Sequence, residues 1–513
     1  MPSANKSLPF HAALQVFSRL RSEGKKIVQC HGTFDLLHPG HIVHFEEAKA
    51  LGDILVVTVT SEKHVNKGPG RPYFNDELRT KYLSSLEYID YVVVVPFPAA
   101  REAIECVRPH IYCKGKEYED PKIDITGNIY DDIQVVKRLG GRVHYVGSVV
   151  FSSTKLLNNH FEIHPSQMKE FCKKLAAKYT PERFREIVDG FRDLKVLIIG
   201  DTIFDRYSSV KVQGLTSKNR IISTRFLFED MQAGGALAVL RHVKQFTPNI
   251  KFISMVGTEE WVEPVLAKYV SLEEDGIVRS PDFTTIIKQR FVEPLQEGKE
   301  LSKLFSINVI REQYSNEKTI TLACDIIDGC IKDYDLVMVM DFGHGFMQES
   351  VRELVQKKAP FLALNCQTNS YNHGFNIIDK QYRRSDSFSL DETELTLSCG
   401  QRNISFYEEL KKLHHRLSAN YGWLTRGGTD TIGIKTGEPE CECMSFEQTV
   451  VDTVGAGDAF CSVASLAAAK GLPIDLATFM GQLAGAQAVR IIGNADSIKK
   501  DKLLKGGMAL LSF

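Results

Sequence analysis

The sequence of 513 residues lacks the features that mark several classes of protein. It contains no run of about 18 apolar residues, the length a membrane-spanning helix needs. Its start, Met1 to Phe10, has no apolar core of the kind found in signal peptides. It also lacks a charge excess, with 63 Lys and Arg against 64 Asp and Glu, whereas nucleic-acid-binding proteins are usually basic. We therefore expect a cytoplasmic protein with no membrane and no nucleic acid among its partners.

Cysteine spacing gives no sign of a zinc site or of a disulfide framework. The 11 cysteines are an odd number, scattered from Cys30 to Cys461, and no two have C-x-x-C spacing. The closest pair, Cys441 and Cys443, is better explained as two loop residues than as metal ligands. We interpret the cysteines as reduced thiols in an ordinary globular protein, because 43% of the residues are hydrophobic and 25% are charged.

Apolar runs rich in β-branched residues alternate with helical patterns in two blocks, which is typical of parallel sheets built from βαβ units. The first block predicts helices that begin near His41, Asp76, Ala99 and Ile129, between strands over 26–30, 54–60, 91–96 and 142–146. The second predicts strands over 195–199, 251–255, 336–340, 361–364, 387–390 and 422–425. We expect an α/β domain over 1–160, a helical linker over 161–190 and a second α/β domain over 191–513.

A segment rich in glycine and histidine, Cys30 to His41, follows the first predicted strand, where open α/β sheets bind ligands. Gly32 and Gly40 would let a phosphate chain approach the backbone, and the helix start after Gly40 offers N–H groups to an anion. His38 and His41 are three residues apart, so one helical turn aims both imidazoles the same way. Both could donate hydrogen bonds to the charge that builds on an attacked α-phosphate. A capping histidine or part of a zinc site is the weaker alternative, because no third ligand is nearby.

The string G-x-F-D-x-x-H-x-G-H within this segment resembles the signature of the nucleotidyltransferase family that includes cytidylyltransferases and adenylyltransferases. The resemblance implies a Rossmann-like domain in which His38 and His41 stabilise the transition state. It also implies that Lys49, Arg71 and Lys114 bind phosphates and that Ser152, Ser153 and Thr154 form a helix start at the triphosphate. The full set of implied nucleotide-binding residues is Gly32, Thr33, Phe34, Asp35, Gly40, Lys49, Arg71, Lys114, Ser152, Ser153 and Thr154. Cleavage of an α,β-phosphate bond normally needs Mg²⁺, which we infer from the chemistry alone. The string leaves CTP and ATP equally open as substrates.

A second glycine-rich segment, Val451 to Phe460, precedes an alanine-rich helical run. Small residues at Gly455, Ala456 and Gly457 leave N–H groups unobstructed at a helix start, which forms an anion hole for a transferring phosphoryl group. Asp458 then has the position and charge of a general base that takes a proton from an attacking hydroxyl. The alternative is a tight turn with a capping aspartate.

The string D-T-x-G-A-G-D-x-F resembles the signature of the ribokinase-like (PfkB) sugar kinases, which implies an α/β/α domain with a small β lid. The string Gly200 to Tyr207, G-D-x-x-x-D-R-Y, is similar to that of heptose-phosphate kinases in particular. The resemblance implies sugar binding by Asp201, Asp205, Gly234 and Gly235. It implies an ATP site that includes Asp391, Glu394, Thr425, Gly427, Gly455, Ala456 and Gly457. Asp391 and Glu394 would organise Mg²⁺ through water.

Three positions depart from the kinase pattern. Ala238 and Asp391 each replace a customary Asn, and Asn365-Cys366-Gln367 replaces a customary D-P-K. Loss of the amide at 238 would leave a sugar hydroxyl unpaired at a cost of about 1 to 3 kcal/mol. We therefore expect a changed acceptor more than an inactive kinase.

The whole chain resembles the bifunctional heptose-phosphate kinase and heptose-1-phosphate adenylyltransferase enzymes, with the two domains in the opposite order. The resemblance implies a nucleotide-sugar product such as ADP-heptose for lipopolysaccharide, made from a sugar phosphate and ATP or CTP. Two alternatives stay open: a nucleotidyltransferase acting on a polyol or other phosphate, and a kinase-like domain that binds a sugar without turnover. Family resemblance also suggests a homodimer paired through lid strands.

Overall fold

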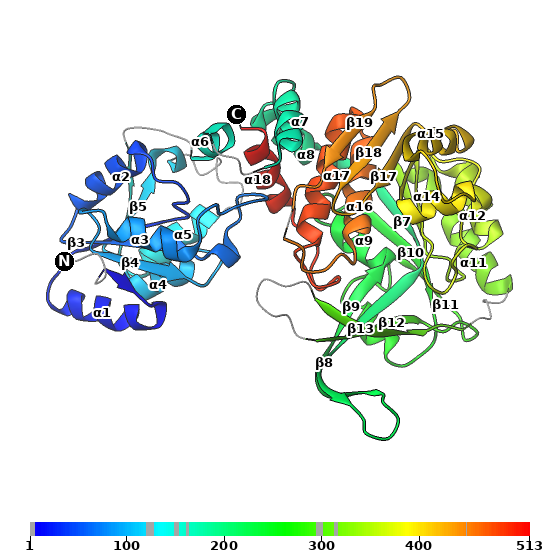
Figure 1. Cartoon of the computed structure of the whole chain (residues 1–513), viewed down its shortest axis with the longest axis horizontal. Coiled ribbons are helices and arrows are strands. Elements are labelled where there is room, and N and C mark those ends of the chain that lie inside the picture. The colour runs from blue at the N-terminus through cyan, green and yellow to red at the C-terminus, as the bar shows by residue number, and fades with distance from the viewer. Residues whose placement is uncertain are drawn as a thin grey trace. The chain divides into compact units, whose positions relative to one another are not determined.

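The computed structural model describes residues 6–119, 128–147, 153–160, 164–293, 301–311, 317–447 and 449–512. The chain forms two compact units, and many of their elements are labelled in Figure 1. The first comprises Met1–Pro181 together with Leu504–Phe513, and the second comprises Glu182–Leu503. The sequence division assigned all of 191–513 to one domain, whereas the last ten residues pack with the first unit.

The first unit is built on a six-stranded, fully parallel sheet of order β1-β4-β3-β2-β5-β6. Its strands are β1 (Ser7–Leu8), β2 (Ile27–Gly32), β3 (Ile54–Thr60), β4 (Tyr91–Val95), β5 (Ile111–Gly115) and β6 (Arg142–Val146). All four strands predicted for this block are present. Since β2 pairs with β3 on one side and β5 on the other, the winding of the sheet reverses at β2. The crevice at the carboxyl ends of β2 and β5 is therefore the expected ligand site.

Helices cover both faces of this sheet, which explains why its strands are nearly continuous apolar runs. Val28 and Val57 pack on one face with Phe45 of α2, and Ile27 and Val56 pack on the other with α1. The helices of this unit are α1 (Phe10–Ser22), α2 (Pro39–Lys49), α3 (Asp76–Ser84), α4 (Arg101–Val107), α5 (Asn128–Arg138), α6 (Ser153–His160) and α7 (Ser166–Ala176), with 3-10 turns η2 (Glu62–His64) and η3 (Lys116–Tyr118).

The second unit contains a nine-stranded sheet of order β11-β10-β7-β14-β15-β16-β17-β18-β19. Its strands are β7 (Val196–Gly200), β10 (Ile250–Val256), β11 (Gly276–Arg279), β14 (Leu336–Asp341), β15 (Leu362–Cys366), β16 (Ser387–Asp391), β17 (Tyr421–Thr425), β18 (Asp430–Lys435) and β19 (Cys441–Met444). The six strands predicted for this block are present. They run parallel, so their carboxyl ends meet along one edge, and only β18 and β19 are antiparallel additions.

A separate four-stranded sheet, the lid, has the order β13-β12-β8-β9. Its strands are β8 (Thr202–Leu215), β9 (Ile222–Gly235), β12 (Ile286–Glu293) and β13 (Ser302–Val309). Beyond Ser209, β8 is paired only with β9, and this hairpin projects from the unit in Figure 1. The expected α/β/α domain with a β lid is thus confirmed, although the sequence did not locate the lid strands.

The remaining helices belong largely to the second unit, apart from α18, whose residues from Leu504 on belong to the first. They are α8 (Pro181–Asp189), α9 (Ala236–Val243), α10 (Val262–Leu266), α11 (Glu317–Asp328), α12 (Glu349–Lys358), α13 (Ile378–Gln381), α14 (Glu392–Cys399), α15 (Phe406–Arg416), α16 (Ala456–Ala469), α17 (Ile474–Ala488) and α18 (Lys500–Leu510), with 3-10 turns η5 (Gly190–Asp193) and η6 (Ile331–Asp333). In the part of the chain that the structure describes, none of the helices has the length and apolarity to cross a membrane.

Candidate active sites

The first unit has a cavity of about 300 Å³ at the carboxyl ends of β2 and β5, where the winding of the sheet reverses. The structure brings seven of the predicted residues to its wall: Gly32, Thr33, Phe34, His38, Gly40, His41 and Lys114. The same wall includes charged or titratable residues that sequence reasoning missed: His31, His44, Lys67, Asp132 and Lys505. His44 extends the i, i+3 spacing of His38 and His41 by one more step, a signal that the sequence carried.

His38 and His41 form a stacked pair beside the cavity. His38 is the extended N-cap residue of α2, and His41 lies in the first turn, so their ring centroids are 3.8 Å apart at 17°. The edge-on ring of Phe34, 5.4 Å away, supports the ring of His41. Burial, together with the charges of His38 and Lys67, lowers the pKa of His41 to about 3, and burial also lowers the pKa of His38. Both imidazoles are therefore neutral at pH 7 with one N–H each, and the ring of His41 also forms a hydrogen bond with the backbone of Leu36.

Lys114 at the end of β5 supplies a positioned cation. Its ammonium lies 3.2 Å from a carboxylate oxygen of Asp132 and 5.3 and 5.6 Å from the ring centroids of Tyr112 and Tyr118. Asp132 also accepts a hydrogen bond of 3.1 Å from the hydroxyl of Tyr112. These contacts hold the Lys114 charge at the cavity wall.

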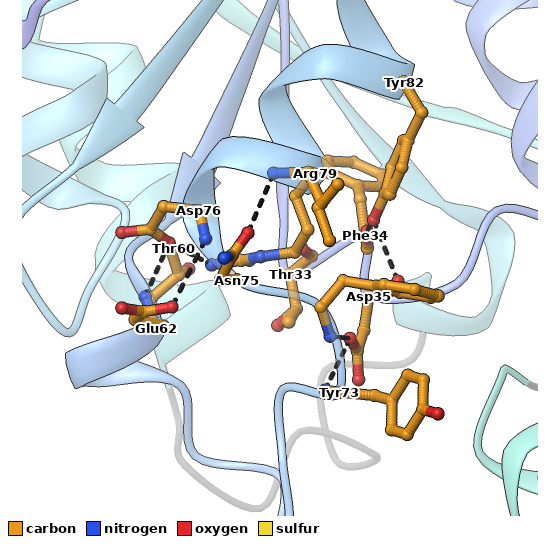
Figure 2. A network of polar contacts seen from close by, with 12 residues as sticks. Thr33, Phe34, Asp35, Thr60, Glu62, Tyr73, Asn75, Asp76, Arg79 and Tyr82 are labelled. Atoms are coloured by element: carbon orange, nitrogen blue, oxygen red, sulfur yellow. Dashed lines mark hydrogen bonds and ion pairs between the residues drawn. The ribbon is translucent and has the colours of Figure 1, made fainter. Parts of the chain in front are cut away.

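Helix α3 holds the loop after β2, as Figure 2 shows. The guanidinium of Arg79, which is fully buried, donates to the carbonyl of Thr33 at 2.7 Å and pairs with Asp76. The hydroxyl of Tyr82 donates to the carbonyl of Asp35 at 2.8 Å and also to that of Phe34. Phe34 has a φ of 46°, a conformation that few non-glycine residues adopt without such support. Arg79 and Tyr82 share a helix face at i, i+3, but the sequence did not indicate this role.

Several predicted nucleotide-binding residues lie outside the cavity wall. Arg71 and Asp35 form a buried ion pair at 3.1 Å, and Asp35 also accepts backbone N–H groups of Tyr73 and Phe74 at 2.8 and 3.0 Å. Lys49 pairs with Asp90 at 2.5 Å. The structure therefore gives these three residues protein partners and leaves them off the cavity wall, although Arg71 acts on the cavity residue Lys67. Of the predicted helix start, Ser152 and the side chain of Ser153 lie outside the described residues, and Thr154 lies in the first turn of α6.

The second unit presents a buried carboxyl at the start of α16. The amide of Gln367, just beyond β15, donates to Asp458 Oδ1 at 2.7 Å and to Asn365 Oδ1 at 2.7 Å. Burial raises the pKa of Asp458 to about 7, with a contribution from the charge of Asp205, while Gln367 and Lys288 oppose the rise. A carboxyl with this pKa can accept a proton from a hydroxyl near neutral pH.

The turn before Asp458 requires glycine. Gly455 is the N-cap residue of α16 with a φ of 83°, and a Cβ there would lie 2.4 Å from the amide oxygen of Asn494. Ala456 and Gly457 follow in the first turn, whose N–H groups point out of the helix start toward any bound anion. The predicted anion hole and the predicted base are therefore adjacent.

The predicted sugar ligands are engaged with the protein. Asp201 accepts backbone N–H groups of Phe342, His344 and Phe346 at 2.9, 3.3 and 3.3 Å. Asp205 pairs with Arg290 and accepts from the side-chain amide of Asn494 at 3.0 Å.

The two predicted sugar-site glycines allow close packing of the strands that carry these aspartates. A Cβ at Gly234 would lie 2.2 Å from Asp205 Oδ2, and one at Gly235 would lie 2.7 Å from the Asp201 carbonyl. Both glycines are therefore needed by the protein itself at this edge.

Asp391 and Glu394 form a capping box at the start of α14. Asp391 accepts the Glu394 N–H at 2.8 Å, and Glu394 accepts the N–H groups of Asp391 and Thr368, each at 3.0 Å. Burial, with the charge of Asp391, raises the pKa of Glu394 to about 8. Over the described ranges, no three His, Cys, Asp or Glu side chains are grouped to hold a metal. The residues fit Mg²⁺ bound through its water shell, which this ion tends to retain, better than a direct cage.

Thr425 and Gly427 lie at the end of β17, beside β16 and its Asp391. The Thr425 hydroxyl donates to the carbonyl of Leu390 at 3.2 Å, and Gly427 has a φ of 56° in the turn to β18. Both predicted nucleotide-site residues therefore reach the same sheet edge as Asp391 and Gln367.

Two protein families match the chain. Residues 30–223 match the cytidylyltransferase-like family, and residues 383–501 match the pfkB family of carbohydrate kinases. The chain combines a cytidylyltransferase-like domain with a pfkB carbohydrate kinase domain. Proteins of both families use nucleotides. This confirms the predicted fold class and both predicted family resemblances.

Relatives and solved structures resemble parts of the two-domain chain. Among curated relatives, the "Bifunctional protein HldE" of Aliarcobacter butzleri is 37% identical over 26% of this chain and 28% of its own length. That of Methylococcus capsulatus is 40% identical over 28% of this chain and 29% of its own length. The chain thus spans less than a third of the length of these relatives. Phosphofructokinase-2 of Escherichia coli covers 62% of this chain and 99% of its own, with 12% identity and a TM-score of 0.49. Ribokinase of Thermotoga maritima covers 60% and 98%, with 14% identity and a TM-score of 0.46.

Proposed function

We propose that the chain is a bifunctional enzyme of nucleotide-sugar biosynthesis. Its pfkB domain phosphorylates a sugar or sugar phosphate of the heptose-7-phosphate type with ATP. Its cytidylyltransferase-like domain transfers a nucleotidyl group from ATP or CTP to the sugar 1-phosphate and releases pyrophosphate. The observation that carries the proposal is the stacked, neutral histidine pair in a lysine-lined cavity at the switch point of the first sheet.

In the nucleotidyl transfer, a phosphate oxygen of the acceptor attacks the α-phosphorus of the nucleotide, and the bond to pyrophosphate breaks. His38 and His41 donate N–H groups to the oxygens on which charge accumulates, and Lys114 offsets the charge of the phosphates. Arg79 and Tyr82 donate to the carbonyls of Thr33 and Asp35 and so keep this loop in place during the reaction. A bound Mg²⁺ would neutralise the departing pyrophosphate.

In the phosphoryl transfer, Asp458 takes the proton of the attacking sugar hydroxyl while the γ-phosphoryl group leaves ADP. The first-turn N–H groups of α16 stabilise the oxygens of the transferring group. Gln367 orients the Asp458 carboxyl, since its amide donates to one oxygen and leaves the other for the hydroxyl. Asp391 and Glu394 would hold hydrated Mg²⁺ near the phosphates.

We propose a cytoplasmic enzyme whose partners are nucleotides and sugar phosphates, with no nucleic acid or membrane. We also propose a homodimer, in support of which the lid strands β9 and β13 expose Phe226, Phe228, Phe305 and Ile307. Large apolar side chains gathered on one exposed sheet are uncommon on monomeric proteins.

Pyrophosphate release from CTP and ATP, with heptose, hexose and polyol phosphates offered in parallel, tests the nucleotidyl transfer. Turnover with one sugar 1-phosphate identifies the base and the acceptor together. Turnover with a polyol phosphate alone would replace the nucleotide-sugar proposal. Absence of pyrophosphate release with every acceptor would overturn it.

A second candidate is a pfkB domain that binds a sugar without turnover. The Asp205–Arg290 ion pair and the three backbone contacts of Asp201 favour it, because they occupy carboxylates that sugar hydroxyls would need. The substitutions at Ala238 and Asn365 point the same way. Sugar-dependent formation of ADP by the His41→Ala chain, whose nucleotidyl transfer is removed, would exclude this candidate.

A further inference from the structure

The cavity of the first unit receives a lysine from the far end of the chain. Lys505 lies in α18, more than 300 residues beyond the last strand of this sheet, and it lines the same cavity as His38, His41 and Lys114. Burial lowers the pKa of the cavity residue Lys67, and the charges of Arg71 and then of Lys505 lower it further. Like charges are therefore gathered at one wall, an arrangement that disfavours the empty cavity and favours an anion within it.

Three contacts hold the C-terminal segment, Leu504 to Ser512, against the first unit. The buried side-chain amide of Asn158 in α6 donates to the carbonyls of Ala509 and Ser512, each at 2.7 Å. These are carbonyls at the end of α18, where a helix has no internal donors. The amide thus ties the end of the last helix to α6.

The third contact explains a glycine pair inside a helix. Gly506 and Gly507 are both buried within α18, where each glycine costs about 1 kcal/mol relative to alanine. A Cβ added at Gly68 would lie 2.9 Å from the Cα of Gly506, so the loop that carries Lys67 and the helix that carries Lys505 approach backbone to backbone. This close approach holds the two lysines at one wall of the cavity.

We propose that the C-terminal segment is an integral part of the nucleotidyltransferase site and that Lys505 binds a phosphate group of the nucleotide there. The inference rests on the proposed nucleotidyl transfer. It adds a phosphate-binding residue from outside the family match at 30–223. It also implies that the two activities cannot be separated by cutting the chain after the first sheet.

Binding of CTP, ATP and inorganic tripolyphosphate to the full-length chain tests the inference by titration calorimetry. We expect Lys505→Ala to weaken binding of at least one of them about 10- to 100-fold, as loss of a charge-assisted hydrogen bond does. Lys505→Arg should restore most of the affinity. Lys502→Ala removes an exposed lysine from the same helix and should bind like the unaltered chain. Sugar-dependent ADP formation and the thermal unfolding midpoint of Lys505→Ala should stay unchanged.

The outcomes separate the two proposals. If the unaltered chain binds these ligands and Lys505→Ala binds them equally well, the inference is wrong and the nucleotidyl transfer stands. If only tripolyphosphate binds, and Lys505→Ala weakens it, the phosphate role of Lys505 stands and the nucleotide reaction fails. If none of the three binds to the unaltered chain, both proposals fail.

Discussion

At the scale of single residues, burial shifts the pKa of one group in each candidate site, downward for a histidine and upward for an aspartate. Burial lowers the pKa of His41 to about 3, so that the imidazole stays a neutral donor. Burial raises the pKa of Asp458 to about 7, so that the carboxyl can serve as a base at neutral pH. Both shifts disfavour the charged form, and each matches the chemistry proposed for its site.

The Asp458 carboxyl should control the pH dependence of phosphoryl transfer. Because the base must be ionised, kcat/KM for sugar phosphorylation should fall as pH drops below about 7 and level off above it. Gln367→Leu removes a hydrogen bond that lowers this pKa, so the rise should move to higher pH. Asp458→Asn should cost about 10²- to 10⁴-fold at every pH and leave pyrophosphate release intact. Asp333→Asn, an exposed aspartate, is the control. An unchanged rate in Asp458→Asn would refute the assigned base.

His41 should matter only for nucleotidyl transfer. His41→Ala removes a donor to the developing charge, and we expect pyrophosphate release to fall about 10²- to 10³-fold with sugar phosphorylation unchanged. His11→Ala, an exposed histidine of α1, should behave like the unaltered chain. In ¹H–¹⁵N spectra, bound CTP or ATP should raise the pKa of His41, since a nearby anion favours the imidazolium. Equal pyrophosphate release by His41→Ala would remove the pair from the mechanism.

At the scale of elements, helix α3 acts as the support of the loop after β2. The hydroxyl of Tyr82 and the guanidinium of Arg79 satisfy three successive carbonyls, Thr33 to Asp35. Because a strand end alone cannot hold such a loop, the precision of the histidine site depends on a helix about 40 residues further along the chain.

Removal of one support should loosen this loop. Tyr82→Phe deletes the donor to two carbonyls, and we expect about 1 to 3 kcal/mol loss in the free energy of unfolding of the first unit, measured in urea. The KM for the nucleotide should rise as well. Tyr130→Phe, at an exposed tyrosine of α5, provides the comparison. A KM and a stability equal to those of the unaltered chain would show that the loop does not depend on α3.

At the scale of the whole molecule, the chain carries two sites in two compact units and an apolar lid surface. A homodimer would have twice the chain mass of 57.6 kDa. Light scattering after gel filtration should give this dimer mass for the unaltered protein. The double variant Phe226→Ser, Phe228→Ser should have the mass of one chain. The control pair Lys268→Ser with Lys357→Ser alters exposed lysines of the same unit outside the lid and should leave the mass unchanged. A single-chain mass for the unaltered protein would exclude the dimer.

Ten of the fifteen strands described in the two large sheets, and both glycine-rich signatures, could be read from the sequence alone. Strands buried on both faces are continuous apolar runs, and the turn at Gly455, with a φ of 83°, needs glycine. Such local requirements are visible within a short window of sequence. The lid strands were not predicted. Strands β9 and β13 are mostly exposed, and β8, although buried over most of 202–210, mixes polar and apolar residues.

Tertiary structure alone decided which charged residues share a site. The family resemblance suggested Lys49 and Arg71 as phosphate ligands, which stays a prediction. In the structure they pair with Asp90 and Asp35 and do not line the cavity. Conversely, Lys505 lines the cavity although it lies in the last helix of the sequence. That helix is held there by the hydrogen bonds of Asn158 and by the close backbone contact between Gly68 and Gly506. A sequence pattern reports the chemistry of residues that are neighbours along the chain. Contacts between residues hundreds of positions apart depend on packing, which only the folded molecule shows.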